Sequence, residues 1–324
     1  MTVNVGFRTI YQKHAEQVVH SYDGTPIPQE AHIWPSADEL GAVRSREPLN
    51  ATLDGVCAGR CFFEAEHYPF AELQNLVVAP QSRGKGVGDA LVADAIKRAL
   101  ELGYLAIHLQ VARDNTVAHR LYTKHGFLPA QQGELLKMIR FLDYPALALF
   151  LSRHPLALPS SRRNSTGALW EMKWEDAVSH DSIAILPAGG SCQADSDGFG
   201  PGVGAFELRC GGVQFRADVS APNEVSKGRE FVIGLRVENS GSTEIEGSCR
   251  LLLNSGFAPG GDTKGSASLR VAPGASESMA LPVIVAESFD EDFWKYSCFR
   301  SVPVCVEVRI CEHVFWLAKQ VKVG

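Results

Sequence analysis

Residues 75–88, NLVVAPQSRGKGVG, join an apolar segment to three glycines, each separated from the next by one residue. Glycine is favoured where the backbone turns unusually or comes close to another group. A strand, then such a turn, then a helix leaves free backbone N–H groups at the start of the helix, where a phosphate is stabilised. Arg83 and Lys85 add positive charge at the same place. The stretch therefore predicts a cradle for a phosphorylated ligand, and the alternative is a plain tight turn.

The residues that follow indicate an alternation of helix and strand. Apolar residues recur at helical spacing over residues 87–100, and Gly103 is placed to end that helix. Residues 105–112 alternate in the manner of a strand, and residues 114–126 read as a short helix with Asp114 or Asn115 as its cap. Before the loop, residues 56–66 and 70–79 read as neighbouring strands. The glycine turn therefore lies between a strand and a helix, as the cradle requires.

Composition limits the classes of protein that fit. The chain has 324 residues, which suggests two domains, and its 45% apolar and 21% charged residues are ordinary for a globular protein. The net charge of −6 argues against bulk binding of nucleic acid or anionic membranes. We see no signal peptide and no run of eighteen apolar residues, so we expect a cytoplasmic protein without a membrane segment.

The cysteines do not suggest a metal site. Eight are present, and none of them forms a CxxC pair of the kind that zinc sites usually use. We therefore expect reduced, mostly buried thiols and no bound metal.

The residue composition of the sequence changes after residue 145. Residues 146–204 combine short helical segments with loop-like, glycine-rich stretches, and we interpret them as a linker. Residues 205–324 contain seven or so short strands separated by turn clusters, which predicts an all-β sandwich.

Two common glycine motifs do not fit the loop. A P-loop requires GxxxxGK followed by Ser or Thr, and the dinucleotide fingerprint requires GxGxxG, whereas Gly84, Gly86 and Gly88 give GxGxG. The segment from Gln81 to Gly86 instead resembles the acetyl-CoA loop of the GNAT N-acetyltransferase superfamily. The downstream text NTVAHRLYTKHGF, from Asn115, is similar to that family's second signature. The resemblance covers roughly residues 50–130, and more weakly residues 1–145.

The resemblance implies a fold and a cofactor site. Residues 1–145 would form an α+β GNAT fold, a mixed, mostly antiparallel, splayed sheet with flanking helices. The sandwich over residues 205–324 lies outside this resemblance, and its strand pattern alone is similar to that of immunoglobulin-like domains. The pantetheine arm of acetyl-CoA would lie in the splay between residues 72–79 and 105–112, with its pyrophosphate on the amides of residues 83–88. The implied cofactor-binding residues are Leu76, Val77, Val78, Gln81, Arg83, Gly84, Lys85, Gly86, Val87, Gly88 and Asn115.

The resemblance also implies the chemistry. Tyr122 would protonate the departing CoA thiolate, because a phenol with a pKa of about 10 stays a donor at neutral pH. Glu72 would take a proton from the amine, and Glu64 and Glu66 could contribute. The alternatives are a core aromatic residue for Tyr122, an ordinary helix cap for Asn115, and solvated strand-end charges for the three glutamates.

We therefore predict an acetyl-CoA-dependent N-acetyltransferase that acts on a primary amine. One alternative is a sensor or scaffold that binds acyl-CoA without turnover, and another is an enzyme that uses a longer acyl-CoA. The acceptor amine is not identified by the sequence. The sandwich could bind a protein partner or mediate self-association.

Overall fold

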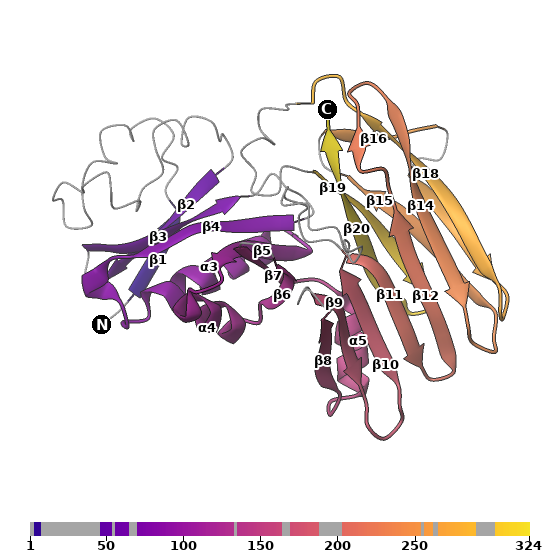
Figure 1. Cartoon of the computed structure of the whole chain (residues 1–324), viewed down its shortest axis with the longest axis horizontal. Coiled ribbons are helices and arrows are strands. Elements are labelled where there is room, and N and C mark those ends of the chain that lie inside the picture. Colours follow the sequence, from indigo (N-terminus) through magenta and orange to yellow (C-terminus); the bar gives the residue numbers. More distant parts are fainter. Residues whose placement is uncertain are drawn as a thin grey trace. The chain divides into compact units, whose positions relative to one another are not determined.

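The computed structural model describes residues 3–7, 46–53, 56–64, 70–132, 135–163, 169–187, 203–253, 256–261, 265–289 and 302–324. The chain divides into two compact units, Met1–Leu128 with Met138–Leu142, and Pro129–Lys137 with Asp143–Gly324 (Figure 1). The residue Glu66 and the side chain of Glu64 lie outside what the structure describes.

The first sheet has the strand order β1-β2-β3-β4-β5-β7-β6. Neighbours from β1 to β4 pair antiparallel, whereas β4 and β5 pair parallel, so the sheet is mixed as expected. Its strands are β1 (Val3–Phe7), β2 (Arg46–Leu53), β3 (Val56–Glu64), β4 (Phe70–Val78), β5 (Ala106–Ala112), β6 (Leu128–Gln132) and β7 (Leu135–Phe141).

The sheet opens between β4 and β5. These strands pair only from Phe70 opposite Ala106 to Glu72 opposite His108. Just beyond this point the β3–β4 register shifts, and Asn75 on β4 has a positive φ of 48°. A bulge of this kind bends a strand and increases its local twist. The part of β4 from Leu73 to Val78 therefore leaves β5, which is the splay that the family resemblance implied.

Among the described residues of the first unit, the helical segments are η2 (Pro80–Ser82), α3 (Val87–Glu101) and α4 (Thr116–Lys124). Helix α3 buries one apolar face, and Gly59 on β3 permits its close approach. A Cβ at Gly59 would lie 2.8 Å from Val87 Cγ1 and 2.9 Å from the carbonyl oxygen of Val77. The buried residues of α3 are Val87, Leu91, Val92, Ala95, Ile96 and Ala99.

The second unit contains helix α5 (Pro145–Arg153) and two sheets with the strand orders β16-β18-β14-β12-β11-β10-β9-β8 and β13-β20-β19-β15-β17 (Figure 1). The strands are β8 (Leu158–Arg163), β9 (Leu169–Glu175), β10 (Ser182–Pro187), β11 (Val203–Cys210), β12 (Val213–Ser220), β13 (Glu224–Val225), β14 (Glu230–Asn239), β15 (Ile245–Leu252), β16 (Phe257–Pro259), β17 (Ser266–Val271), β18 (Ser276–Val285), β19 (Val302–Ile310) and β20 (His313–Val323).

Aromatic side chains join the two sheets of this unit. Phe206 on β11 stacks on Phe315 of β20 with ring centroids 4.1 Å apart, and Phe215 on β12 lies 5.8 Å from the same ring. The indole nitrogen of Trp316 donates to the carbonyl oxygen of Asp143 at 2.8 Å, and the Tyr144 hydroxyl donates to the carbonyl oxygen of Trp316 at 3.2 Å. These bonds hold the start of α5 against β20.

The structure differs from the expected linker at 146–204. Strands β8, β9 and β10 extend the larger sheet, and Ile183 on β10 pairs with Leu208 on β11. Ile183, Ala184, Ile185 and Leu186 are all buried, so SIAILP is a short apolar strand that is covered on both faces. The surrounding Ser, Pro and Gly masked this short pattern. Residues 188–202, which include most of the glycine-rich text, lie outside the described ranges.

None of the helices in the described ranges is both long enough and apolar enough to cross a membrane.

Candidate active site

The glycine loop connects β4 to α3 through two residues in the left-handed region. Gly84 has a φ of 74° and Gly86 a φ of 81°. A Cβ built at either position would meet no atom within 4 Å. Neighbouring side chains therefore do not require these glycines, whereas the backbone conformation does, and the space beside them is open to a ligand.

The backbone N–H groups at this end of α3 are open. The first hydrogen bond of the helix runs from the Ala90 N–H to the Gly86 carbonyl oxygen, 3.0 Å, and Gly86 has no side chain that could cap the turn. In the described part of the chain, the N–H groups of residues 84–89 have no hydrogen-bond acceptor. Open N–H groups at a helix N-terminus, together with the helix dipole, suit an anion.

The sequence suggested that the amides available to a pyrophosphate begin at Arg83, and the structure differs on this point. Its N–H already donates to the Pro80 carbonyl oxygen at 3.3 Å, so the open amides begin at Gly84. The Arg83 guanidinium Nε donates to the Val78 carbonyl oxygen, also at 3.3 Å, and the side chain is exposed. The cation is thereby held at the end of β4, next to the open amides.

The last two residues of the loop motif have packing roles. The Val87 side chain is buried, and a Cβ at Gly88 would lie 3.2 Å from Leu121 Cδ2 of α4. Gly88 therefore lets α3 and α4 approach each other. Only the main chain of these two residues is placed to contact a ligand.

The segment of β4 that leads into the loop has one open edge. Val77 and Val78 pair with Arg60 and Gly59 on β3, and with the described part of β5 they make no pairs. Leu76, Val77 and Val78 are all half-buried. Main-chain groups on such an edge can pair with an extended ligand as an additional strand would.

Helix α4 carries Asn115 and Tyr122. Asn115 is the N-cap, and its Oδ1 accepts from the Ala118 N–H at 3.1 Å, as the capping alternative predicted. Tyr122 is 6% exposed and packs edge-on against Phe127, with centroids 5.8 Å apart. No described residue hydrogen-bonds to the Tyr122 hydroxyl. Burial, and to a smaller extent the neighbouring Cys61, raise the pKa of Tyr122, so the phenol stays protonated at neutral pH.

Glu72 is buried, with 1% of its surface exposed. Gln74 Nε2 donates to Glu72 Oε2 at 2.7 Å, and the register places Glu64 of β3 and His108 of β5 opposite Glu72. The alternative of a solvated strand-end charge is therefore wrong for Glu72. The sequence reading missed His108, which is also buried, because alternation along β5 assigned it to the polar face of a strand that is covered on both faces.

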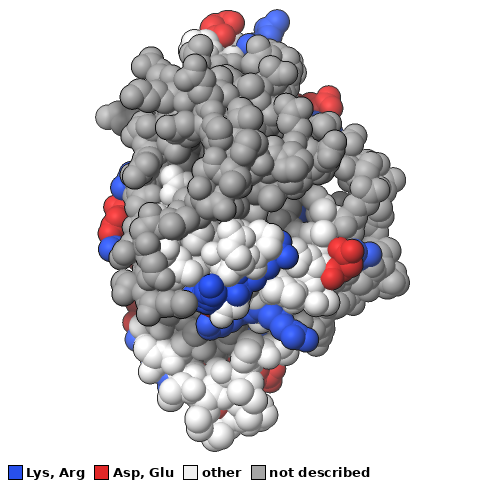
Figure 2. All heavy atoms as spheres, turned by 90° about the vertical axis from the view of Figure 1, so that its left-hand side faces the viewer, with Lys and Arg blue, Asp and Glu red and all other residues white. Residues whose placement is uncertain are grey.

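Charges near the loop are mostly positive. Asp89, in the first turn of α3, accepts from Lys124 Nζ at 2.7 Å and lies 3.1 Å from His125 Nε2, and the Lys124 hydrogen bond lowers the pKa of Asp89. Arg83 and Lys85 are exposed. Figure 2 shows a group of Lys and Arg side chains on the face that it draws. The positive charges of Arg83 and Lys85 beside the loop suit a phosphorylated ligand.

Comparisons with known proteins agree with this geometry. Residues 11–127 match the acetyltransferase (GNAT) family. A stretch of 75 residues, 23% of the chain, is 43% identical to mycothiol acetyltransferase from Jonesia denitrificans and covers 24% of that protein's length.

Solved structures resemble less than half of the chain. An IAA acetyltransferase from Bacillus cereus covers 44% of this chain and 100% of its own, with 15% identity and a TM-score of 0.35. A GNAT family acetyltransferase from Elizabethkingia anophelis with acetyl-CoA bound covers 43% and 98%, with 19% identity and a TM-score of 0.33. Neither likeness bears on the activity of this chain. By the match over residues 11–127, the chain contains a GNAT-family acetyltransferase domain.

Proposed function

We propose that the protein is an acetyl-CoA-dependent N-acetyltransferase that moves the acetyl group from the CoA thioester to a primary amine. One observation carries this proposal: the open edge of β4 leads directly into the open N–H groups of residues 84–89. The pantetheine arm of acetyl-CoA can pair with the strand edge, and the pyrophosphate at the end of that arm can accept from the open N–H groups.

The proposed cofactor lies along these groups from one end to the other. The pantetheine amides pair with the main chain of Leu76, Val77 and Val78, and the pyrophosphate accepts from the amides of residues 84–89. The exposed side chains of Gln81, Arg83 and Lys85 surround the phosphates. Because Asn115 Oδ1 is used by the cap, only its Nδ2 group remains to donate to the pantetheine.

The reaction needs one proton acceptor and one proton donor. Glu72 takes a proton from the ammonium form of the substrate, directly or through one water. The neutral amine attacks the thioester carbonyl carbon, the C–S bond breaks, and the sulfur leaves as a thiolate. Tyr122 gives its phenolic proton to that thiolate, and the raised pKa of Tyr122 keeps this proton in place until the sulfur departs. The nitrogen of the new amide releases its remaining extra proton, which restores the Tyr122 phenol.

We also propose that the described strands within residues 205–324 form an immunoglobulin-like sandwich. Strands β12, β14 and β18 are neighbours in one sheet, whereas β15, β17, β19 and β20 belong to the other, so the chain crosses between sheets repeatedly. The short strand β13 leaves the first group and pairs parallel with β20. This arrangement resembles a Greek-key sandwich. An experimental structure in which β14 and β15 share one sheet would contradict it.

The function is tested by measuring CoA-thiol release from acetyl-CoA with the full-length protein and a panel of amines, antibiotics and lysine-bearing peptides. Native mass spectrometry of the protein as purified reports any bound acyl-CoA. Stoichiometric transfer of acetyl to one amine supports the proposal. Tight binding of acetyl-CoA with no transfer to any acceptor would support a sensor, and faster turnover with a longer acyl-CoA would change the donor.

A further inference from the structure

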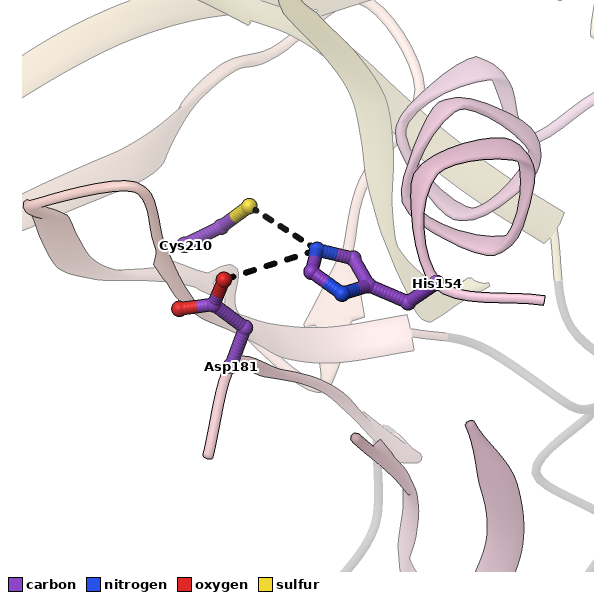
Figure 3. A group of neighbouring side chains, drawn as sticks. All are labelled: His154, Asp181 and Cys210. Atoms are coloured by element: carbon purple, nitrogen blue, oxygen red, sulfur yellow. Dashed lines mark hydrogen bonds and ion pairs between the residues drawn. The ribbon is translucent and has the colours of Figure 1, made fainter. Parts of the chain in front are cut away.

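Three side chains with metal-ligating atoms meet in the second unit. His154 follows the C-terminus of α5, Asp181 precedes β10, and Cys210 ends β11 (Figure 3). One ligand atom from each side chain lies within 4.8 Å of the other two. The three positions are distant in the sequence, so no spacing motif reveals them, which explains why the cysteine pattern predicted no metal.

The distances match those between two ligands of one tetrahedral cation, and the contact with Asp181 is long for a direct hydrogen bond. His154 Nε2 lies 3.6 Å from Cys210 Sγ and 3.5 Å from Asp181 Oδ2. A charge-assisted N–H···O bond is about 2.7–2.9 Å long, so the contact with Asp181 is too long for a strong one. Two ligands on a tetrahedral zinc ion are about 3.6 Å apart for a nitrogen and a sulfur, and about 3.4 Å for a nitrogen and an oxygen.

A second carboxylate and an aromatic ring lie beside the imidazole of His154. Its other nitrogen, Nδ1, lies 3.4 Å from Asp176 Oδ2, which is also longer than a strong charge-assisted hydrogen bond. Asp176 Oδ1 in turn accepts from the N–H groups of Val178 and Ser179 at 2.8 and 3.0 Å. The imidazole also stacks on Phe150, with centroids 4.6 Å apart. A carboxylate behind a metal-binding histidine fixes the tautomer and strengthens the ligand.

The set of donors also selects the metal. A thiolate, an imidazole and a carboxylate suit Zn²⁺, whereas Mg²⁺ and Ca²⁺ prefer oxygen ligands only. Glu312, which also lies in this unit, is committed to Arg153 through bonds of 2.5 and 2.7 Å. Three protein ligands leave one position of a tetrahedral site for water.

A Cys–His–Asp nucleophile is the rival explanation, because His154 also lies between Cys210 and Asp176. A nucleophilic cysteine needs a surrounding that favours its thiolate. Here the Asp181 carboxylate faces the same histidine nitrogen as the sulfur does, and a second negative charge disfavours a free thiolate. A divalent cation between the three atoms removes that conflict.

We propose that His154, Asp181 and Cys210 bind one Zn²⁺ ion, with Asp176 as the positioning residue behind His154. The ion would fasten the end of α5 to the β9–β10 turn and to the end of β11. This site is independent of the acetyltransferase reaction proposed above.

The test uses the full-length protein without a histidine tag, stripped with a chelator and titrated with ZnCl₂ by calorimetry and with CoCl₂ by absorption. We expect one ion per chain and a sulfur-to-cobalt charge-transfer band. Cys210→Ser should remove the band, and both Cys210→Ser and His154→Gln should weaken zinc binding more than about 100-fold. Asp176→Asn should keep the band and weaken binding about 10–100-fold.

Cys249→Ser is the matched control, because Cys249 is another buried cysteine whose sulfur lies 4.0 Å from Met279 Sδ, and this variant should bind as the unchanged protein does. Absence of stoichiometric zinc binding, or a charge-transfer band that survives Cys210→Ser, would overturn the proposal. Rapid alkylation of Cys210 that zinc does not slow would overturn it too, in favour of the nucleophile. If Cys210→Ser does not fold, His154→Gln and Asp176→Asn still decide the outcome.

Discussion

The two ends of helix α3 share a left-handed backbone conformation at a glycine, but they differ in whether the nearby N–H groups are hydrogen-bonded. Gly86 before the helix and Gly103 after it both have left-handed φ values, 81° and 75°, and both have open space where a Cβ would stand. At the C-terminal end, the N–H groups of Leu102, Gly103 and Tyr104 donate to helix carbonyls at 3.0–3.1 Å. At the N-terminal end, the N–H groups of residues 84–89 have no acceptor in the described part of the chain.

This difference shows what a glycine-rich turn can and cannot indicate. A Ser, Thr or Asp cap at the open end would stabilise the helix by about 1 kcal/mol. Main-chain groups left open where a simple cap would satisfy them therefore point to a ligand. Each prediction below pairs a change near the open end of α3 with a matched change at the closed end or with a control condition.

The largest effect is expected at Tyr122. Tyr122→Phe removes only the hydroxyl, so kcat should fall about 100-fold while acetyl-CoA binding stays intact, because the departing thiolate loses its proton donor. Tyr104→Phe, beside the closed end, is the control and should leave kcat within about twofold. Steady-state kinetics and calorimetry measure both quantities. Equal losses of binding and rate in Tyr122→Phe would make Tyr122 a packing residue.

A smaller effect is expected at Glu72, on the strand that leads to the open end. Glu72→Gln keeps the shape and the contact with Gln74 but removes the basicity, so kcat/KM should fall about tenfold near neutral pH. The loss should shrink as pH rises, since more of the amine is then already neutral. Glu101→Gln at the closed end should show no such dependence on pH. Unchanged kinetics of Glu72→Gln at every pH would assign the base to water, Glu64 or Glu66.

The charge of a lysine at the open end of α3 should contribute less to acetyl-CoA binding than the backbone amides do. Lys85 is exposed, so Lys85→Gln should raise the Kd for acetyl-CoA roughly two- to fivefold, and the effect should fade with added salt. Lys97→Gln is the control, because Lys97 lies near the closed end, 3.8 Å from Glu101. A salt-independent loss in Lys85→Gln, or an equal loss in Lys97→Gln, would argue against a direct contact with phosphate.

The smallest effect concerns Asp89 and pH. Its lowered pKa means that the contacts with Lys124 and His125 stabilise the fold above the unfolded pKa of about 4, and that this contribution is lost as pH falls through the folded pKa. Asp89 is 39% exposed, so Asp89→Asn should cost less than about 1 kcal/mol at pH 7. Urea denaturation at pH 7 and at pH 3 should show that cost shrinking at the lower pH. A constant difference would mean that the carboxylate charge contributes nothing.

Local patterns predicted α3, its end at Gly103 and the glycine turn, because these depend on neighbours in sequence. They failed where the outcome depends on distant partners. Strands β8–β10 pair in series with one another and with β11, which follows them in the chain. Glu72 is buried between the strands on either side of it. The cluster around His154 brings together three separate segments. Asn115 is an intermediate case, because the sequence pattern allowed both a helix cap and a ligand contact. Its Oδ1 caps the helix, and its Nδ2 can still donate to a ligand.

The most direct test of the open end is calorimetric titration of acetyl-CoA into the unchanged protein, Gly86→Ala and Gly103→Ala. Both variants place a Cβ on a left-handed backbone and should lose about 1–2 kcal/mol of stability each. Only Gly86→Ala should raise the Kd, at least about tenfold or 1.4 kcal/mol, because its methyl group holds the pyrophosphate away from the open amides. A folded Gly86→Ala protein that binds acetyl-CoA as tightly as Gly103→Ala does would contradict the proposal that these amides hold the cofactor.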